Sequence, residues 1–135
     1  AKSSTHLCTI DLHKKRKIDR SNTFVYLKLK SDDLYIENHL LLEKPKLCNL
    51  RDPAIQTEIA KAPGGFAVTV SCTYPAFEVA MDAQDIPGVF SDNLFAIRPT
   101  AQKIIIFKTQ TEVTLEKFKE KLQVYDLWGS SHGDA

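Results

Sequence analysis

The segment Phe66-Ala67-Val68-Thr69-Val70-Ser71-Cys72 decides the fold class. Its larger apolar residues occupy every second position and are separated by Ala, Thr and Ser. Successive side chains of a β-strand point to opposite faces, so this period of two predicts a strand with one buried face. Two turn signals bound the strand, Pro63-Gly64-Gly65 before it and Tyr74-Pro75 after it.

The same alternation recurs along most of the chain. Period-two patterns predict further strands at 7–12, 23–29, 34–42 and 77–81. The run Lys103-Ile104-Ile105-Ile106-Phe107 is continuously apolar after its lysine, which is typical of a strand covered on both faces. Residues 122–128 are a last strand candidate. Seven or more short strands with turns between them indicate a sandwich or a barrel.

One segment favours a helix. Leu115, Phe118 and Leu122 are spaced i, i+3 and i+7, and Thr114 can cap the N-terminus. Such a helix is too short to be stable alone, so we expect it to fold over one end of the sandwich and lead into the last strand. The predicted fold is all-β, an immunoglobulin-like antiparallel β-sandwich of about seven to nine strands with one short helix near the C-terminus.

The length suits one domain. We expect residues 1–135 to form a single immunoglobulin-like sandwich, with a core over about residues 5–128 and frayed ends. The apolar share of 43% and the charged share of 26% are ordinary for a globular protein. No internal repeat or low-complexity tract divides the chain.

Charge and hydropathy argue against nucleic acid and membranes as partners. The formal net charge is +1, so no overall field attracts polyanions. The basic run Lys14-Lys15-Arg16-Lys17 lacks interleaved aromatic residues and is expected to be a solvated hairpin loop. No apolar stretch approaches the roughly 20 residues of a membrane span. Residues 1–4 lack the apolar region of a signal peptide, and we expect any targeting signal of a parent protein to lie outside this sequence. The compartment stays unassigned: exported (periplasmic, secreted or lysosomal) and cytoplasmic locations are both compatible.

The three cysteines, Cys8, Cys48 and Cys72, have neither metal-ligand nor C-x-x-C spacing. We expect three small buried thiols, which is how free cysteines commonly pack. A single Cys8–Cys72 bridge between the two sheets stays open as the alternative.

No group of residues predicts an active site. The four histidines stand in no recognisable catalytic motif: His6, His13, His39 and His132. His39 lies on the polar side of its strand and is expected to meet solvent. Gly64-Gly65 precedes a strand rather than a helix, which argues against a phosphate-binding loop. We therefore assign no catalytic, cofactor-binding or metal-binding residue, and expect no cofactor.

The acidic stretch 81–93 could be taken for a calcium loop. It lacks the residue order and the final glutamate of an EF-hand, however. Asp, Asn, Pro and Gly favour a structured connection, and we expect Phe90 and Phe95 to pack it against the core.

Exposed aromatic rings can stack on sugars, and five residues are candidates: Tyr26, Tyr35, Tyr74, Tyr125 and Trp128. Tyr26 and Tyr35 lie opposite the apolar residues of their strands, which favours exposure. We nevertheless expect these rings to pack across neighbouring strands, and a sugar-stacking surface is the alternative.

The stretch 77–95 carries a family resemblance. Phe77-Glu78-Val79-Ala80-Met81-Asp82, followed by Asp85-Ile86-Pro87-Gly88-Val89-Phe90-Ser91-Asp92-Asn93-Leu94-Phe95, resembles the closing segment of the β-mannosidases of glycoside hydrolase family 2. Gln102–Phe107 and Leu122–Leu127 are similar to the family's next two strands, and Tyr35–His39 with Leu42 and Pro45-Lys46 is similar to an upstream passage. The most specific part is Phe90-Ser91-Asp92-Asn93. The pattern departs at Leu94, where the family has Gly, and near Val89, where it has Arg.

The resemblance implies a role as well as a fold. It implies a C-terminal immunoglobulin-like domain of a multidomain enzyme that hydrolyses terminal β-mannosides with retention, its two catalytic glutamates lying in a separate barrel. No position here matches that machinery. The glutamates Glu37, Glu58, Glu78 and Glu112 are therefore not proposed as equivalents of the catalytic pair. The expected function is a non-catalytic accessory domain that packs on other domains of the parent and leaves an apolar patch exposed when isolated. The alternatives are a carbohydrate-binding module, the same domain from a related exo-glycosidase, or an independent interaction domain.

Overall fold

Strands and loops make up most of the described chain. The structure, a computed structural model, describes residue 6 and residues 9–11 and 18–132. Within those residues the elements are β1 (Phe24–Lys30), β2 (Tyr35–Leu41), η1 (Pro45–Leu47), β3 (Gln56–Ala62), β4 (Gly65–Ser71), β5 (Ala76–Asp82), β6 (Val89–Phe90), β7 (Phe95–Ile97), β8 (Lys103–Lys108), α1 (Leu115–Lys121), β9 (Gln123–Tyr125) and α2 (Leu127–His132).

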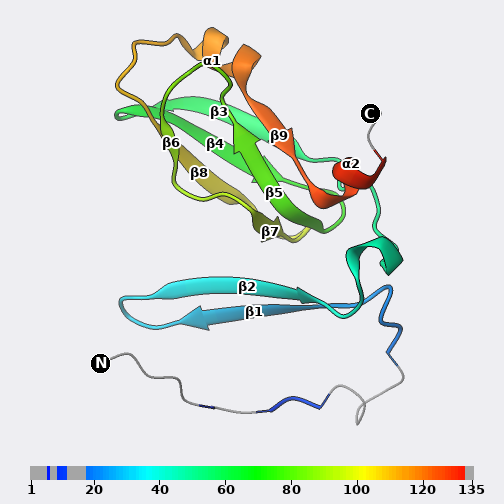
Figure 1. Ribbon diagram of the computed structural model, residues 1–135. Helices are drawn as coiled ribbons and strands as arrows, with labels where there is room; N and C mark the ends of the chain where they lie inside the picture. The colour runs from blue at the N-terminus through cyan, green and yellow to red at the C-terminus, as the bar shows by residue number, and fades with distance from the viewer. Residues whose placement is uncertain (1–5, 7–8, 12–17, 133–135) are drawn as a thin grey trace.

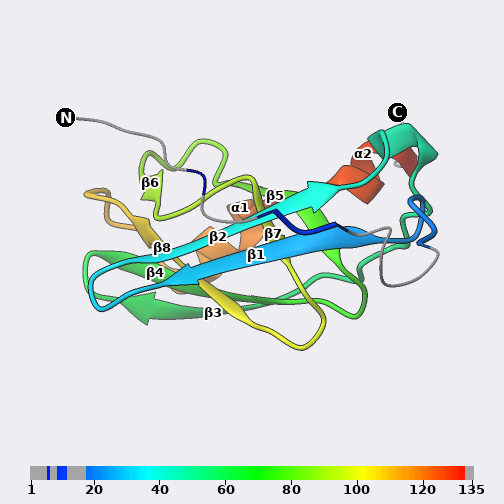
Figure 2. The same ribbon diagram turned by 90° about the horizontal axis from the view of Figure 1, so that it is seen from below.

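The strands form three antiparallel sheets. Four strands in the order β3-β4-β8-β6 and three in the order β7-β5-β9 make the two sheets of the sandwich, and β1 and β2 form a separate hairpin. Figure 1 shows the hairpin as a third layer beneath the sandwich, and Figure 2 shows it running across that face of the molecule. The predicted all-β, immunoglobulin-like sandwich is confirmed, and the nine described strands lie within the predicted range.

The core follows the predicted alternation. Phe66, Val68 and Val70 of β4 are at most 3% exposed, whereas Ala67 and Thr69 between them are only half-buried. The neighbouring strands contribute further buried residues: Val79 and Met81 from β5, Phe95 and Ile97 from β7, and Ile105 and Phe107 from β8. The predicted packing of Phe95 in the core is confirmed, and Phe90 lies 4.7 Å from Phe107 between ring centres.

Helix α1 closes one end of the sandwich, as predicted. The Thr114 hydroxyl accepts a hydrogen bond from the Lys117 backbone N–H at 3.2 Å and caps the helix. Phe118 is fully buried and stacks on Phe66 and Phe107, with ring centres 4.3 and 5.0 Å apart. The chain then passes directly into β9, so the helix positions the last strand.

The C-terminal end corrects the prediction of a strand over 122–128 followed by a frayed tail. Strand β9 ends at Tyr125, and Leu127–His132 form a second short helix. Asp126 separates the two elements, because its Oδ1 accepts from the Gly129 backbone N–H at 3.0 Å, as a helix N-cap does. No helix among the described residues is long and apolar enough to cross a membrane.

Three strands were not predicted, and one prediction lies mostly outside the described residues. In β3 only Ile59 and Ala62 are half-buried, so this edge strand lacks a clear alternation. Strands β6 and β7 have two and three residues, too few for a period to be visible. Residues 9–11 of the strand predicted at 7–12 belong to no strand. The rest of that strand, His13 and the basic run at 14–17 are outside the described residues.

The orientation of the β1–β2 hairpin corrects the expectation that the apolar residues of these two strands face the interior. The outward face carries the apolar side chains, and Leu27, Leu29 and Leu40 are 52%, 54% and 58% exposed. The opposite face lies against the sandwich, where the rings of Phe24 and His39 are 4.9 and 5.5 Å from Phe77. His39 is therefore half-buried rather than exposed, because its ring packs on an aromatic partner.

Candidate functional site

A polar cleft lies between the hairpin and the sandwich. It encloses about 570 Å³ and is lined on the hairpin side by Tyr26, Tyr35 and Glu37. The opposite wall comes from the ends of β7 and β8 and the loops beside them. Its charged side chains are Asp92, Arg98 and Lys103. A hollow of about 130 Å³ shares several of these residues and extends to Leu94.

On the hairpin side, Glu37 is the centre of a small polar network. The Tyr35 hydroxyl donates to Glu37 Oε1, and Lys28 Nζ lies 3.9 Å from the same oxygen. Burial alone would raise the pKa of Glu37, but hydrogen bonds from Tyr26 and Tyr35, together with Lys103 and Lys28, lower it below its usual value. Burial and the Glu37 carboxylate raise the pKa of Tyr26 to about 12. Glu37 is thus held ionised and Tyr26 neutral at physiological pH.

On the sandwich side, two cations are held in fixed positions. Lys103 Nζ lies 2.7 Å from Asp92 Oδ2 and 4.6 Å from the centre of the Phe95 ring. The Arg98 guanidinium lies over the Tyr26 ring, 4.2 Å from its centre, a cation–π contact that joins the sandwich to the hairpin. Arg98 Nε is buried and makes no hydrogen bond in the structure.

The motif at 90–93 ties the two sheets of the sandwich together. The Ser91 backbone N–H donates to the Ile106 carbonyl at 2.7 Å, and Ser91 Oγ accepts from the Ile106 N–H at 2.9 Å. Asn93 Oδ1 accepts from the Met81 N–H at 2.7 Å, and Asn93 Nδ2 donates to the Met81 carbonyl at 3.1 Å. Since Ile106 is on β8 and Met81 on β5, the loop is anchored to both sheets, and the aspartate between these anchors is held at the cleft.

Leu94 continues this loop in a strained conformation. Its φ is +57°, in the left-handed region that a residue with a Cβ adopts at a cost, and its side chain is 68% exposed. The Gly that the family pattern has at this position suits such a backbone, so the departure noted in the sequence falls where glycine is conformationally favoured.

The predicted aromatic candidates do not gather on one surface. Tyr26 and Tyr35 meet at the cleft, but Tyr74 lies under Arg51, with the guanidinium carbon 5.1 Å from its ring centre. Trp128 stacks on His132 within α2, with ring centres 4.8 Å apart. Tyr125 is 53% exposed on β9. Only the first two can therefore act on one ligand.

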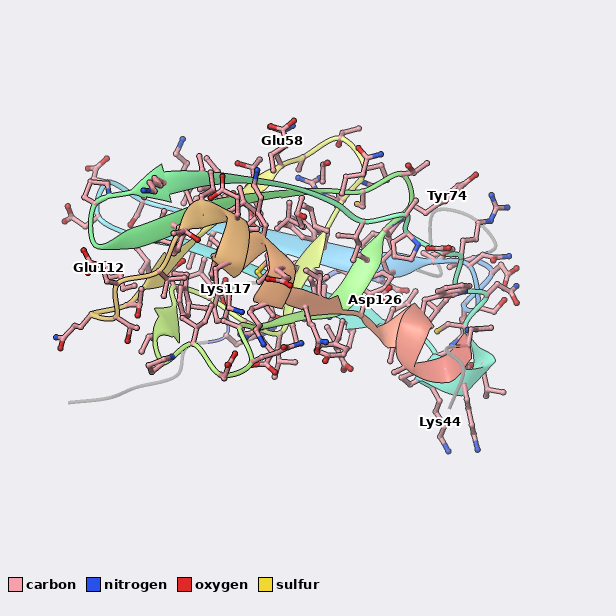
Figure 3. The ribbon with its side chains drawn as sticks, turned by 90° about the horizontal axis from the view of Figure 1, so that it is seen from above. Lys44, Glu58, Tyr74, Glu112, Lys117 and Asp126 are labelled. Atoms are coloured by element: carbon pink, nitrogen blue, oxygen red, sulfur yellow. The ribbon has the colours of Figure 1, made fainter. Side chains whose placement is uncertain are left out.

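The histidines and the glutamates outside the cleft do not gather at one site either. His6 is exposed and hydrogen-bonded to Thr9. Figure 3 shows Glu58 on β3 and Glu112 in the loop before α1, at separate edges of the molecule. Among the described residues no group of three or more His, Cys, Asp or Glu could hold a metal ion.

Two of the three cysteines can be placed. Cys72 is a buried free thiol whose Sγ lies 3.6 Å from the Ile97 carbonyl, and Cys48 is free and half-buried. Burial raises the pKa of the Cys72 thiol. Cys8, the partner in the alternative disulfide, lies outside the described residues.

The cleft residues Arg98, Lys103 and Asp92 could not be assigned to a site from the sequence. Lys103 and Asp92 belong to the segments that carry the family resemblance, and this membership was the one sequence feature that singled them out. An arginine following a short strand gives no signal of its own.

The two-sheet sandwich and its closing helix define an immunoglobulin-like domain. Residues 50–130 match the model of the Ig_mannosidase family, described as an Ig-fold domain. The match covers more than half of the chain, and the chain therefore belongs to this family of mannosidase Ig-fold domains. Strands β1 and β2 lie outside the matched range, so the hairpin wall of the cleft is not part of the family match. Comparison with curated proteins gave no match.

Proposed function

We propose that this chain is a non-catalytic accessory domain of a β-mannosidase-type glycoside hydrolase and that it packs on another domain of the parent enzyme. The family match supports the association with a mannosidase. The parent reaction would be retaining hydrolysis of terminal β-mannosides by two carboxylic acids in a separate barrel domain.

The observation that carries the packing role is the outward face of the hairpin, formed by alternate residues of β1 and β2 and the turn between them. Its members are Leu27, Leu29, Leu34, Ile36 and Leu40, all between 47% and 58% exposed. Antiparallel sheets in globular proteins normally bury their apolar face against another layer. Apart from Asn38, which lies opposite Leu27, this open face is apolar, and an exposed apolar face of this kind marks an interaction surface.

The electrostatics of the cleft support a non-catalytic role. A glycosidase general acid needs a raised pKa, so that it stays protonated near neutral pH. Glu37 shows the opposite shift, because two tyrosine hydroxyls and nearby lysines stabilise its charged form. Asp92 is held by Lys103 at 2.7 Å. Both cleft carboxylates thus serve as fixed acceptors.

The packing role is tested by placing the same substitutions in two contexts. Leu27→Ser with Leu40→Ser should change the unfolding free energy of the isolated chain by less than about 1 kcal/mol, because both side chains are already exposed. In the parent enzyme, loss of two buried leucines should cost about 2–5 kcal/mol each. Val89→Ser is the matched control, since Val89 is 70% exposed on β6, and it should be neutral in both. Equal effects in both contexts would exclude packing through this face.

The non-catalytic role is tested separately with a chromogenic β-mannoside. The purified 135-residue chain should show no turnover. Activity that copurifies with the chain through successive columns would contradict this part of the proposal.

A further inference from the structure

We propose that the cleft between the β1–β2 hairpin and the sandwich binds the hydroxyl groups of a neutral oligosaccharide. This inference goes beyond the packing role, because it concerns the inner face of the hairpin and a different kind of partner. It extends the sequence-based alternative of a carbohydrate-binding module by defining which residues would form the site.

The size and composition of the cleft suit sugar hydroxyl groups. Ligand sites combine a concave surface of a few hundred Å³ with a small number of fixed polar groups, and this cleft encloses about 570 Å³. A sugar hydroxyl both donates and accepts. Glu37 and Asp92 offer carboxylate oxygens as acceptors, whereas Lys103 and Arg98 offer N–H donors.

The charges in the cleft favour a neutral ligand. Three cations, Lys28, Arg98 and Lys103, face two carboxylates, Glu37 and Asp92. Lys103 pairs with Asp92, and Lys28 lies near Glu37, so most of the charge is compensated within the site. A polyanion would be repelled by both carboxylates, and a cation would be repelled by the three positive groups. Uncharged hydroxyl groups avoid both penalties and can still bond to the ionised side chains.

Two residues at the walls of the cleft can contact a bound sugar. Arg98 is fixed over the Tyr26 ring with its Nε buried, so the other N–H groups of its guanidinium are the ones that can face a ligand in the cleft. At the edge, Leu94 is strained at φ +57° and 68% exposed. The exposed Leu94 side chain can contact the apolar face of a sugar ring.

Tyr35 is the most suitable residue with which to test the site. It is 55% exposed, its hydroxyl is bonded to Glu37, and its truncation removes little buried surface. The full chain would be titrated with mannohexaose while its amide resonances are followed by NMR. The expected result is a set of amide chemical-shift changes that saturate with a dissociation constant in the millimolar range. The changes should be concentrated at Tyr35, Glu37, Asp92, Leu94 and Lys103.

Variants and a second sugar make the test decisive. Tyr35→Ala and Glu37→Gln should each weaken binding about tenfold, equivalent to roughly 1.4 kcal/mol. Tyr125→Ala, a similarly exposed tyrosine on β9, should leave it unchanged. The variant spectra also show whether each protein is folded, and Glu37→Gln stands as evidence if Tyr35→Ala does not fold.

An anionic comparator, a heparin-derived hexasaccharide, should bind more weakly than mannohexaose. Absence of shifts at the cleft up to the solubility of mannohexaose, shifts that persist in both cleft variants, or tighter binding of the anionic sugar would each overturn the inference. None of these outcomes affects the packing proposal, whose test uses the opposite face of the hairpin and no sugar.

Discussion

Replacing Asn93 with Ala should weaken the sandwich far more than the loss of one loop side chain normally does. The Asn93 amide bonds both the N–H and the carbonyl of Met81, at 2.7 and 3.1 Å, and Met81 is only 4% exposed. Strand β7 begins two residues after Asn93 and pairs with β5. The Asn93 amide therefore fixes the loop to β5 just before β7 starts to pair with that strand. Losing two hydrogen bonds and leaving two buried backbone groups unpaired should cost about 2–4 kcal/mol.

Urea denaturation is the appropriate assay, because a shifted midpoint with an unchanged slope reports a change in stability alone. Asn49→Ala is the control, since Asn49 is exposed and its side chain makes one hydrogen bond, to Ser21 Oγ, and it should cost about 0.5 kcal/mol or less. Asn93→Asp should be strongly destabilised at neutral pH, where a carboxylate cannot donate to the Met81 carbonyl, and should recover partly in acid, where a carboxyl group can. An Asn93→Ala cost within about 0.5 kcal/mol of the wild type would refute the two-sheet anchoring.

Three further substitutions test the core, the loop and the cleft. Phe118→Ala should cost about 3–5 kcal/mol in the same urea assay, because the ring is fully buried between Phe66 and Phe107; a cost under about 1 kcal/mol would show that α1 does not close the core. Leu94→Gly should raise stability by up to about 1 kcal/mol by relieving the left-handed φ, whereas Leu94→Ala should not; equal effects would contradict the strain. The pKa of Glu37 is lowered in the fold, so its contribution to stability is full above its unfolded-state pKa and is lost as the pH falls through the folded value. The stability difference between wild type and Glu37→Gln should therefore shrink on acidification, and a constant difference would show that Glu37 is not stabilised by its tyrosine neighbours.

The strands that could be predicted from sequence are those with one well-buried face. Phe66, Val68 and Val70 alternate with smaller residues, and burial follows that alternation directly. Helix α1 was predictable because its cap and its apolar spacing agree. Strand β3 lies at a sheet edge with little burial on either face, so its residues carry no period. Strand β9 ends before Asp126 because the Asp126 side chain accepts a hydrogen bond from the Gly129 N–H and caps α2. The alternation of apolar residues does not reveal this local contact.

The orientation of the hairpin could not be derived from its pattern. Both faces of β1 and β2 carry large side chains, and the periodicity shows only which residues share a face. Phe24 and Tyr26 meet Phe77 and Arg98, partners separated from them by more than fifty positions in the chain. The cleft was hidden for the same reason. The motif at 90–93 was recognised as specific, but its contact with Met81 becomes visible only in three dimensions.

Hydrogen exchange of the β1–β2 backbone amides, compared between the isolated chain and the parent enzyme, examines whether the hairpin's outer face is an interdomain contact. A two-stranded sheet with one face open is only marginally stable in water. The hairpin amides should therefore exchange rapidly in the isolated chain and much more slowly in the parent, while the amides of β4 and β8 exchange alike in both. Equal exchange of the hairpin in the two proteins would contradict packing through Leu27, Leu29 and Leu40.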